Sequence, residues 1–152
     1  MTDEHGPDIP EQRKYLPTLA ELIDRLSIVL LKAIFIPEHR QEYLIERDLI
    51  EHDIDYVLGQ KKEIYRVLGR DVRAILMLAL TNCCIWQNES KARQGGPEQD
   101  KLLKLTHSIN GQRNVAKNMI ALRALDRIDL KVDCFAAELE KEFGNWNVFN
   151  DA

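Results

Sequence analysis

Long apolar segments are missing from this sequence. The longest apolar run, Ile28 to Ile36, is interrupted by Lys32 and followed by Pro37, whereas a helix that spans a bilayer needs roughly 20 apolar residues. The first ten residues, MTDEHGPDIP, lack the basic and apolar parts of a secretory signal. We therefore expect a cytoplasmic protein that does not act at a membrane.

Cysteine is scarce, and its placement argues against disulfides and metal sites. The chain has three cysteines, Cys83, Cys84 and Cys134, and the first two are neighbours in an apolar stretch, which is typical of buried, reduced thiols. The four histidines show no ligand spacing with the cysteines or with one another. We therefore expect no metal site, and no motif indicates a cofactor.

An excess of basic residues is also missing. The 152 residues include 21 Lys and Arg against 25 Asp and Glu, which gives a net charge of −4 and argues against a nucleic-acid partner. What the chain does have is 45% hydrophobic and 30% charged residues. This balance predicts one globular domain with a sizeable core.

Apolar residues recur at helical spacing along most of the chain. Thr18 and Glu21 form a T-x-x-E capping box after Pro17, and the apolar stripe that follows runs until Pro37, which predicts the first helix. Further helices are predicted at about 38–58, 71–93, 97–125 and 128–143, with a short helical piece at 61–68. Gly59, Gly69 and the Gly95-Gly96-Pro97 loop are the expected breaks, and Asp71 is the expected cap of the third long helix.

The segment after residue 127 allows two interpretations over a short distance. Apolar residues alternate from Ile128 to Cys134 as in a strand, but Val132, Phe135, Leu139 and Phe143 continue at helical spacing for longer. Helix is therefore expected.

The predicted fold is all-α, a single-domain helical bundle of about five helices over residues 16–145. A flexible N-terminal arm is expected at 1–15 and a C-terminal tail at 146–152. The aromatic and apolar residues of the tail would fold back or meet another subunit, and we expect a homo-oligomer.

A polar sector interrupts the expected core face of the helix at 71–93. Val72, Ile75, Leu76 and Ala79 define an apolar stripe. Continuing that stripe by i+3 and i+4 steps reaches Asn82, Trp86, Glu89 and Arg93. Buried charges need a partner, water or a ligand, so this sector is a candidate site.

The next helix carries matching polar groups at the same spacing, namely Thr106, Asn110, Arg113, Asn114 and Lys117. If the two helices are antiparallel neighbours, Glu89 can pair with Arg113. Arg93 and Lys117 can then flank an anionic ligand, because guanidinium groups grip phosphate and carboxylate in a forked geometry.

Eight residues are therefore candidate ligand-binding residues: Asn82, Trp86, Glu89, Arg93, Asn110, Arg113, Asn114 and Lys117. Two interpretations remain open. The cluster can be an internal salt bridge with amides that fix the helix register, or it can hold a small anionic molecule or a partner. The second predicts a binding or assembly module, and whether the protein is an enzyme stays open.

The charged residues of the first and second helices are expected on the surface. Glu21, Asp24, Arg25 and Lys32 lie opposite the stripe of the first helix, and a solvated face is the expectation. The second helix carries an acidic run of Glu42, Glu46, Asp48, Glu51, Asp53 and Asp55. Such a run can bind magnesium, but a solvated surface is again expected.

Three stretches, LPTLAELIDRLSIVLLK, NCCIWQNESKAR and HSINGQRNVAKN, resemble small bacterial and phage domains of unknown function. The shared features are a T-x-x-x-L-I-D-[KR]-L-[ST]-I start, an N-x-x-x-W-x-x-E segment and an I-N-x-x-R-N segment. Members often occur near surface-polysaccharide genes or in phage genomes, and the family implies little about chemistry. The resemblance covers residues 16–32 and 82–118. It implies family-type positions at Asp24, Lys32, Asn82, Trp86, Glu89, Arg93, Asn110, Arg113 and Asn114, whereas an asparagine expected near Val29 or Leu30 is absent.

The chain is also similar, more distantly, to all-α nucleoside triphosphate pyrophosphohydrolases. These enzymes hold magnesium with an E-x-x-E on one helix and an E-x-x-D on the next. Glu21-x-x-Asp24 has the form of the second half, but the first half does not occur. The resemblance implies an alternative function, a magnesium-dependent nucleotide hydrolase that uses Glu21, Asp24 and carboxylates of the second helix.

Overall fold

The computed structural model describes residues 15–129. Within this range the chain forms four α-helices: α1 (Leu19–Phe35), α2 (Arg40–Gln60), α3 (Gly69–Arg93) and α4 (Gln99–Arg123). A short 3-10 turn, η1 (Pro37–His39), joins the first two. The described part has no strand, which confirms the all-α prediction. The predicted fifth helix and the 146–152 tail lie outside the described residues, as does the 1–15 arm apart from Tyr15.

Helix α1 begins and ends where the sequence predicts. The Thr18 hydroxyl accepts a hydrogen bond from the Glu21 N–H at 3.2 Å, and the Glu21 carboxylate accepts one from the Thr18 N–H at 2.8 Å. Two of the backbone donors that every helix start leaves unpaired are thus satisfied. The helix ends at Phe35, and Pro37 opens the turn into α2.

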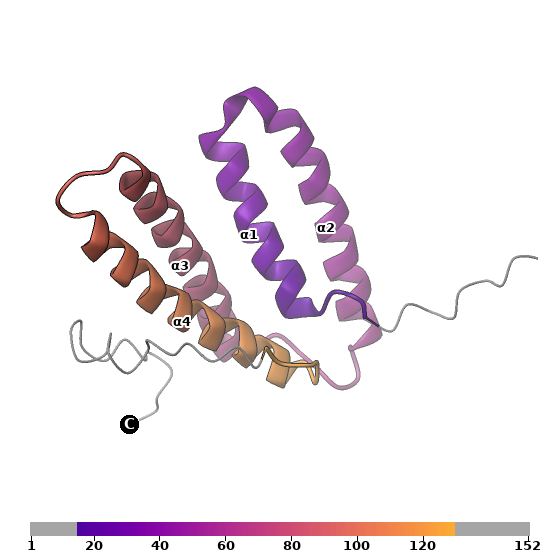
Figure 1. Ribbon diagram of the computed structural model, residues 1–152. Coiled ribbons are helices and arrows are strands. Elements are labelled where there is room, and N and C mark those ends of the chain that lie inside the picture. The colour runs from indigo at the N-terminus through magenta and orange to yellow at the C-terminus, as the bar shows by residue number, and fades with distance from the viewer. Residues whose placement is uncertain (1–14, 130–152) are drawn as a thin grey trace, which may run out of the picture.

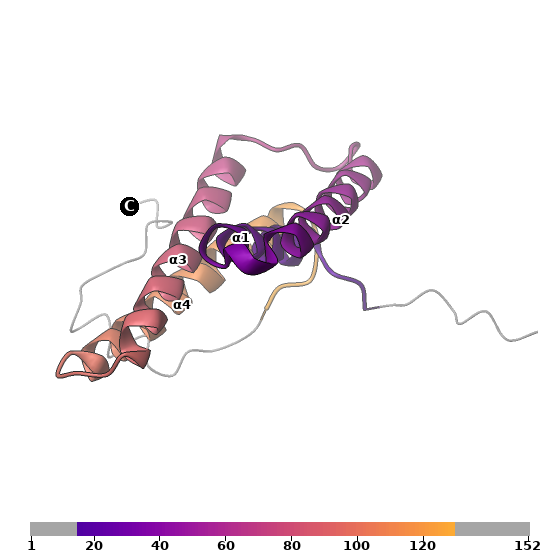
Figure 2. The same ribbon diagram turned by 90° about the horizontal axis from the view of Figure 1, so that it is seen from above.

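The four helices form two antiparallel hairpins, α1–α2 and α3–α4 (Figure 1). Seen from above, the two hairpins cross at an angle (Figure 2). Helix α1 contacts all three other helices, so it is covered on two sides. This central position of α1 decides which of its side chains are buried.

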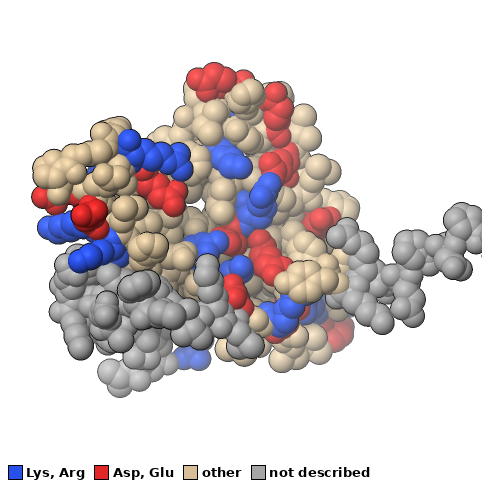
Figure 3. Space-filling view, viewed as in Figure 1, with Lys and Arg blue, Asp and Glu red and all other residues tan. Residues whose placement is uncertain are grey.

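The main hydrophobic core lies where α1 meets α3 and α4. Leu19, Leu78 and Ile120 are its largest fully buried apolar side chains. A smaller cluster between α1 and α2 is built around Leu22, Val29 and Ile50. No helix in the described ranges is long and apolar enough to cross a bilayer. Acidic and basic side chains are interspersed on the face shown in Figure 3.

The prediction of a short helical piece at 61–68 is wrong. The chain there makes a turn after α2 and then runs without regular structure to α3. The reason is that its side chains are tied to distant segments. The Lys61 ammonium donates to the Ala124 carbonyl and to Asp126, each at 2.8 Å, and the buried Tyr65 packs in the main core.

The end of α4 lies within two residues of the predicted one, but its cap is unusual. The helix stops at Arg123, and Leu125 adopts a left-handed conformation with φ 57°. The Asp126 N–H donates to the Ala121 carbonyl at 2.9 Å and the Leu125 N–H to the Leu122 carbonyl at 3.2 Å. These two bonds form a Schellman-type end, which usually has glycine at the left-handed position. With leucine there, the sequence carries no stop signal.

The apolar stripe predicted for α3 faces the core only in part, with Ile75 packed against the main core and Ala79 half-buried. Val72 and Leu76 are exposed, and the buried residues of α3 are Asp71, Ala74, Leu78, Thr81, Asn82 and Ala92. Apolar residues surround α3 on several sides, so its sequence does not mark a single core face. The face with the small Ala74 packs against α4, because a small side chain lets two helices approach closely.

Candidate functional site

The outer half of α3 does not build the predicted interior cluster. Glu89 and Arg93 have side chains that are 50% and 80% exposed, and they form a surface ion pair at 3.8 Å. Trp86 is half-buried and stacks on Phe35 of α1, with ring centroids 6.2 Å apart. The predicted pairing of Glu89 with Arg113 is therefore wrong, because Arg113 bonds instead to Asn82 and Asp24.

Asn82 and Arg113 do meet, and their shared partner is Asp24 of α1. Arg113 donates from Nε to the Asn82 Oδ1 at 2.7 Å and from Nη2 to the Asp24 carboxylate. The Asn82 Nδ2 donates to the other Asp24 oxygen at 2.8 Å and to the Ser27 hydroxyl at 2.7 Å. We call these residues, with Asn110, the Asp24 cluster.

Asn110 and Asn114 occupy the α4 side of this region. The Asn110 Oδ1 lies 3.5 Å from the Arg113 Nη1, a long hydrogen bond. Asn114, next along α4, is half-buried. Asn110 therefore supports the guanidinium from its own helix, while the strong contacts of Arg113 run to α1 and α3.

The Asp24 cluster joins the two hairpins. The Asp24 and Arg113 side chains are only 9% and 20% exposed, and both carboxylate oxygens of Asp24 accept hydrogen bonds. A buried ion pair that is fully hydrogen-bonded is far less costly than one buried charge alone. Together with the core, these bonds connect α1 to α3 and α4 in one arrangement.

Asp24 was expected on a solvated face, and this expectation is wrong. Ala20, Asp24, Ser27 and Leu31 follow one another at i, i+4, i+7 and i+11, so they share a second face of α1. That face is buried against α3 and α4. The sequence signal for this second buried face is the pair of small residues, Ala20 and Ser27, one turn before and one turn after Asp24.

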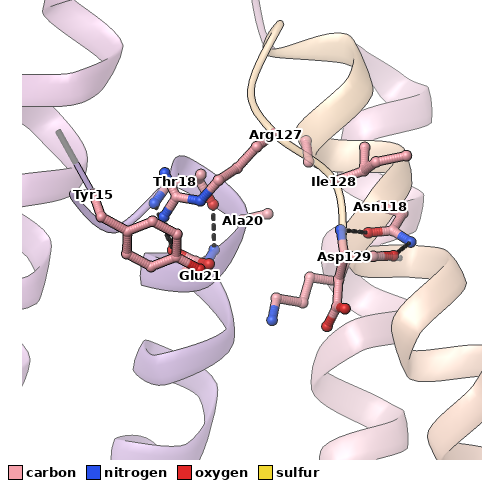
Figure 4. A pocket seen from close by; sticks show the side chains of 10 residues that line it. Tyr15, Thr18, Ala20, Glu21, Asn118, Arg127, Ile128 and Asp129 are labelled. Atoms are coloured by element: carbon pink, nitrogen blue, oxygen red, sulfur yellow. Dashed lines mark hydrogen bonds and ion pairs between the residues drawn. The ribbon is translucent and has the colours of Figure 1, made fainter. Parts of the chain in front are cut away.

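Lys117 is the predicted residue that combines burial with access to a hollow. Its side chain is 17% exposed, and its ammonium lies 4.0 Å from the Asp24 carboxylate. It lines a hollow of about 390 Å³ between the start of α1 and the second half of α4 (Figure 4). The other lining residues are Tyr15, Thr18, Ala20, Glu21, Asn118, Ala121, Arg127, Ile128 and Asp129.

Two sets of contacts shape the walls of the hollow (Figure 4). The Arg127 guanidinium lies 3.9 Å from the centre of the Tyr15 ring and donates to Glu21 at 3.0 Å. Asn118 accepts from the Asp129 N–H at 2.9 Å and donates to the Asp129 carbonyl at 2.8 Å. These bonds attach the segment after α4 to both α1 and α4.

The acidic run of α2 forms a solvated surface, as expected. Five of its six carboxylates are exposed, and Glu46 is half-buried. The Glu46 carboxylate accepts a hydrogen bond from the Arg25 Nε at 2.8 Å. Within residues 15–129, no group of three or more His, Cys, Asp or Glu is placed to hold a metal ion.

A second buried network lies where α3 begins and α4 ends, at the end of the hairpin away from the Gly95-Gly96-Pro97 loop. Asp71 is fully buried and accepts hydrogen bonds from the Leu68 N–H at 2.8 Å, the Tyr65 hydroxyl at 3.0 Å and the Arg123 Nε at 2.6 Å. Asp71 therefore caps α3 from inside its first turn, and the sequence did not indicate its link to Arg123.

The electrostatics of this network follow from its contacts. Burial alone raises the pKa of the Asp71 carboxyl, but hydrogen bonds from Arg123, Leu68 and Tyr65 outweigh it and hold that pKa below its ordinary value. Burial, and then the hydrogen bond to Asp71, raise the pKa of Tyr65 to about 12. The network thus keeps a carboxylate and a neutral phenol side by side.

Comparisons with known proteins found no similar sequence or structure. The chain matches no family model, no curated protein and no solved structure.

Proposed function

We propose that this protein is a binding module that holds a small anionic molecule in the hollow between α1 and α4. The observation that carries this proposal is the position of Lys117. Its ammonium is largely buried, lines the hollow, and has Asp24 as a neighbour only at 4.0 Å. A carboxylate or phosphate in the hollow would give this charge a closer partner.

The contacts of the neighbouring charges support this reading. Asp24 is shared with Arg113, whose hydrogen bond to the carboxylate is much closer than the approach of Lys117. Glu21 and Arg127 form their own pair at 3.0 Å. Desolvating an ammonium is costly unless it is closely paired, so an anion that reaches Lys117 gains more than one on an exposed lysine.

The walls of the hollow supply groups that can orient such a ligand. Arg127 lies along it with its guanidinium over Tyr15, and a guanidinium has donors in a planar fork that suits carboxylate and phosphate oxygens. In this proposal Lys117 and Arg127 contact the ligand. Asn82 and Arg113 position Asp24, while Trp86, Glu89 and Arg93 take no part.

The magnesium-dependent hydrolase draws less support from these contacts. It would require Asp24 as a metal ligand, yet both oxygens of Asp24 already accept hydrogen bonds from Asn82 and Arg113. The carboxylates of α2 that it would also need lie mostly on an exposed face.

Thermal unfolding with candidate anions tests the proposal. The probes are inorganic phosphate, succinate, a nucleoside diphosphate and a sugar nucleotide, each with and without Mg²⁺. A bound anion at 100 times its dissociation constant should stabilise the fold by roughly 2.7 kcal/mol without Mg²⁺. Lys117→Met should abolish this shift, whereas Lys101→Met, at a 69% exposed position on the same helix, should keep it.

Three outcomes would contradict this assignment. One is that no probe stabilises the protein. Another is that a probe stabilises Lys117→Met as much as the unchanged chain. The third is stabilisation that requires Mg²⁺ and is lost in Asp24→Asn, which would instead favour the hydrolase.

A further inference from the structure

The α3–α4 hairpin has an apolar face that is turned away from α1. On α3 it includes Met77, Leu80 and Cys84, and on α4 it includes Val115, Met119 and Leu122. Leu80 and Leu122 are each 60% exposed, and Cys84 is exposed as well. We call these six residues the outer face.

Its orientation follows from the contacts that α3 and α4 make with α1. Asn82 and Arg113 bond to Asp24 of α1, so their side of each helix faces that helix. At roughly 100° per residue, the outer-face residues lie about 120–180° around their helices from Asn82 or Arg113. They therefore share the side of the hairpin opposite α1.

The described chain ends beside this face. From Leu125 to Asp129 the backbone doubles back along α4 (Figures 1 and 2), and Asn118 holds the Asp129 backbone through two hydrogen bonds. Asn118 lies three residues after Val115 and four before Leu122, so it borders the outer face. The 23 residues from 130 to 152 start at that point.

The sequence of this segment complements the outer face. Val132, Phe135, Leu139 and Phe143 repeat at helical spacing, and acidic residues stand between them at Asp133, Glu138, Glu140 and Glu142. Basic residues border the outer face at Arg70 and Arg73 on α3 and at Lys101 and Lys104 on α4. By the same angular measure, all four lie on the side opposite α1.

We propose that residues 130–145 form a fifth helix that packs on the outer face of their own chain. A helix of this length extends about 24 Å. It is therefore shorter than α3 and α4, the two 25-residue helices that it would cover. Its apolar stripe would cover Leu80 and Leu122. This inference concerns packing of the bundle and is independent of the anion site.

The native cysteines allow a direct test in the full chain. If the proposed helix packs on the outer face, it would bring Cys134 near that face, to which the exposed Cys84 belongs. A short bis-maleimide linker, followed by peptide mass spectrometry, should join Cys84 to Cys134 within one chain in the Cys83→Ala variant. The yield should not depend on protein concentration, and Cys84→Ser should abolish this link.

Variants of the segment separate packing from chance proximity. The pair Phe135→Asp and Leu139→Asp should reduce the Cys84–Cys134 link at least tenfold. The matched change Phe149→Asp, outside the proposed helix, should leave it intact. A link that joins two chains and rises with concentration would overturn the proposal in favour of a second copy on this face. Absence of any link, while both thiols still react with a monofunctional maleimide, would also overturn it.

Discussion

Replacing Asp24 by alanine is expected to destabilise the fold by about 3 kcal/mol, the usual cost of removing one partner of a buried ion pair. The variant removes the carboxylate that pairs with the largely buried Arg113 guanidinium. It also removes the anion that lies near Lys117. The loss should appear as a lower urea midpoint with an unchanged slope.

The matched control is Asp53→Ala on α2. The side chain of Asp53 is 64% exposed, and exposed substitutions of this kind change stability by about 0.5 kcal/mol or less. If Asp24→Ala unfolds at the same urea concentration as Asp53→Ala, Asp24 does not connect the hairpins as described.

The second large effect concerns Asp71 and depends on pH. Asp71→Asn should lower the free energy of unfolding at pH 7 by about 3 kcal/mol, because it leaves Arg123 without its buried carboxylate partner. The pKa of Asp71 is lowered in the folded protein from its ordinary 3.8. Its ionised form is therefore bound more tightly by the folded state than by the unfolded state.

The sign of the pH dependence follows from that lowered pKa. The contribution of Asp71 is fully present above pH 3.8, the ordinary value, and it is lost as the pH falls toward the folded pKa. The gap between the unchanged protein and Asp71→Asn in urea unfolding should therefore narrow below this pH. A constant gap between pH 7 and pH 3 would show that ionised Asp71 gives no such stability.

Tyr65→Phe serves as a milder probe of the same network. It removes one hydrogen bond to Asp71, made at 3.0 Å, and keeps the buried ring. The expected loss is about 1 kcal/mol, clearly smaller than that of Asp71→Asn. Equal losses in the two variants would mean that packing around residues 65–71, rather than the charge, sets their effect.

The helices were predictable because their signals are local. The capping box at Thr18 and Glu21 lies within four residues, and Pro37 marks the end of α1 without reference to the rest of the chain. Where a boundary depends on distant contacts, prediction failed. The segment from Lys61 to Tyr65 is held by residues far away in the sequence, and no local pattern records that.

The candidate site was predictable only in part, for a related reason. Periodicity identifies one apolar face of a helix, but α1 is covered on two sides, so Asp24 was assigned to solvent. Helix α3 has apolar residues around much of its circumference, so the predicted stripe included the exposed Val72 and Leu76 beside Ile75, which packs on the core. Glu89 and Arg93 continue the face of α3 that carries the buried Asn82, yet both lie on the surface.

Some residues of the site were still found. Asn82, Asn110, Arg113 and Lys117 were selected because amides and cations recur at helical spacing, and these four do lie in or beside the Asp24 cluster. The resemblance to bacterial and phage domains had also placed Asp24 among its family-type positions. Helical periodicity alone assigned Asp24 to a solvated face, and the structure buries it against α3 and α4.

The contact between Asp24 and Arg113 underlies both the joining of the hairpins and the position of Lys117, and a double-mutant cycle measures it most directly. Urea unfolding of Asp24→Ala, Arg113→Ala and the double variant yields their coupling free energy. We predict a coupling of about 2 kcal/mol, within the range for residues in one salt-bridge network. A coupling that is zero within about 0.5 kcal/mol, the level at which distant sites add, would contradict the contact.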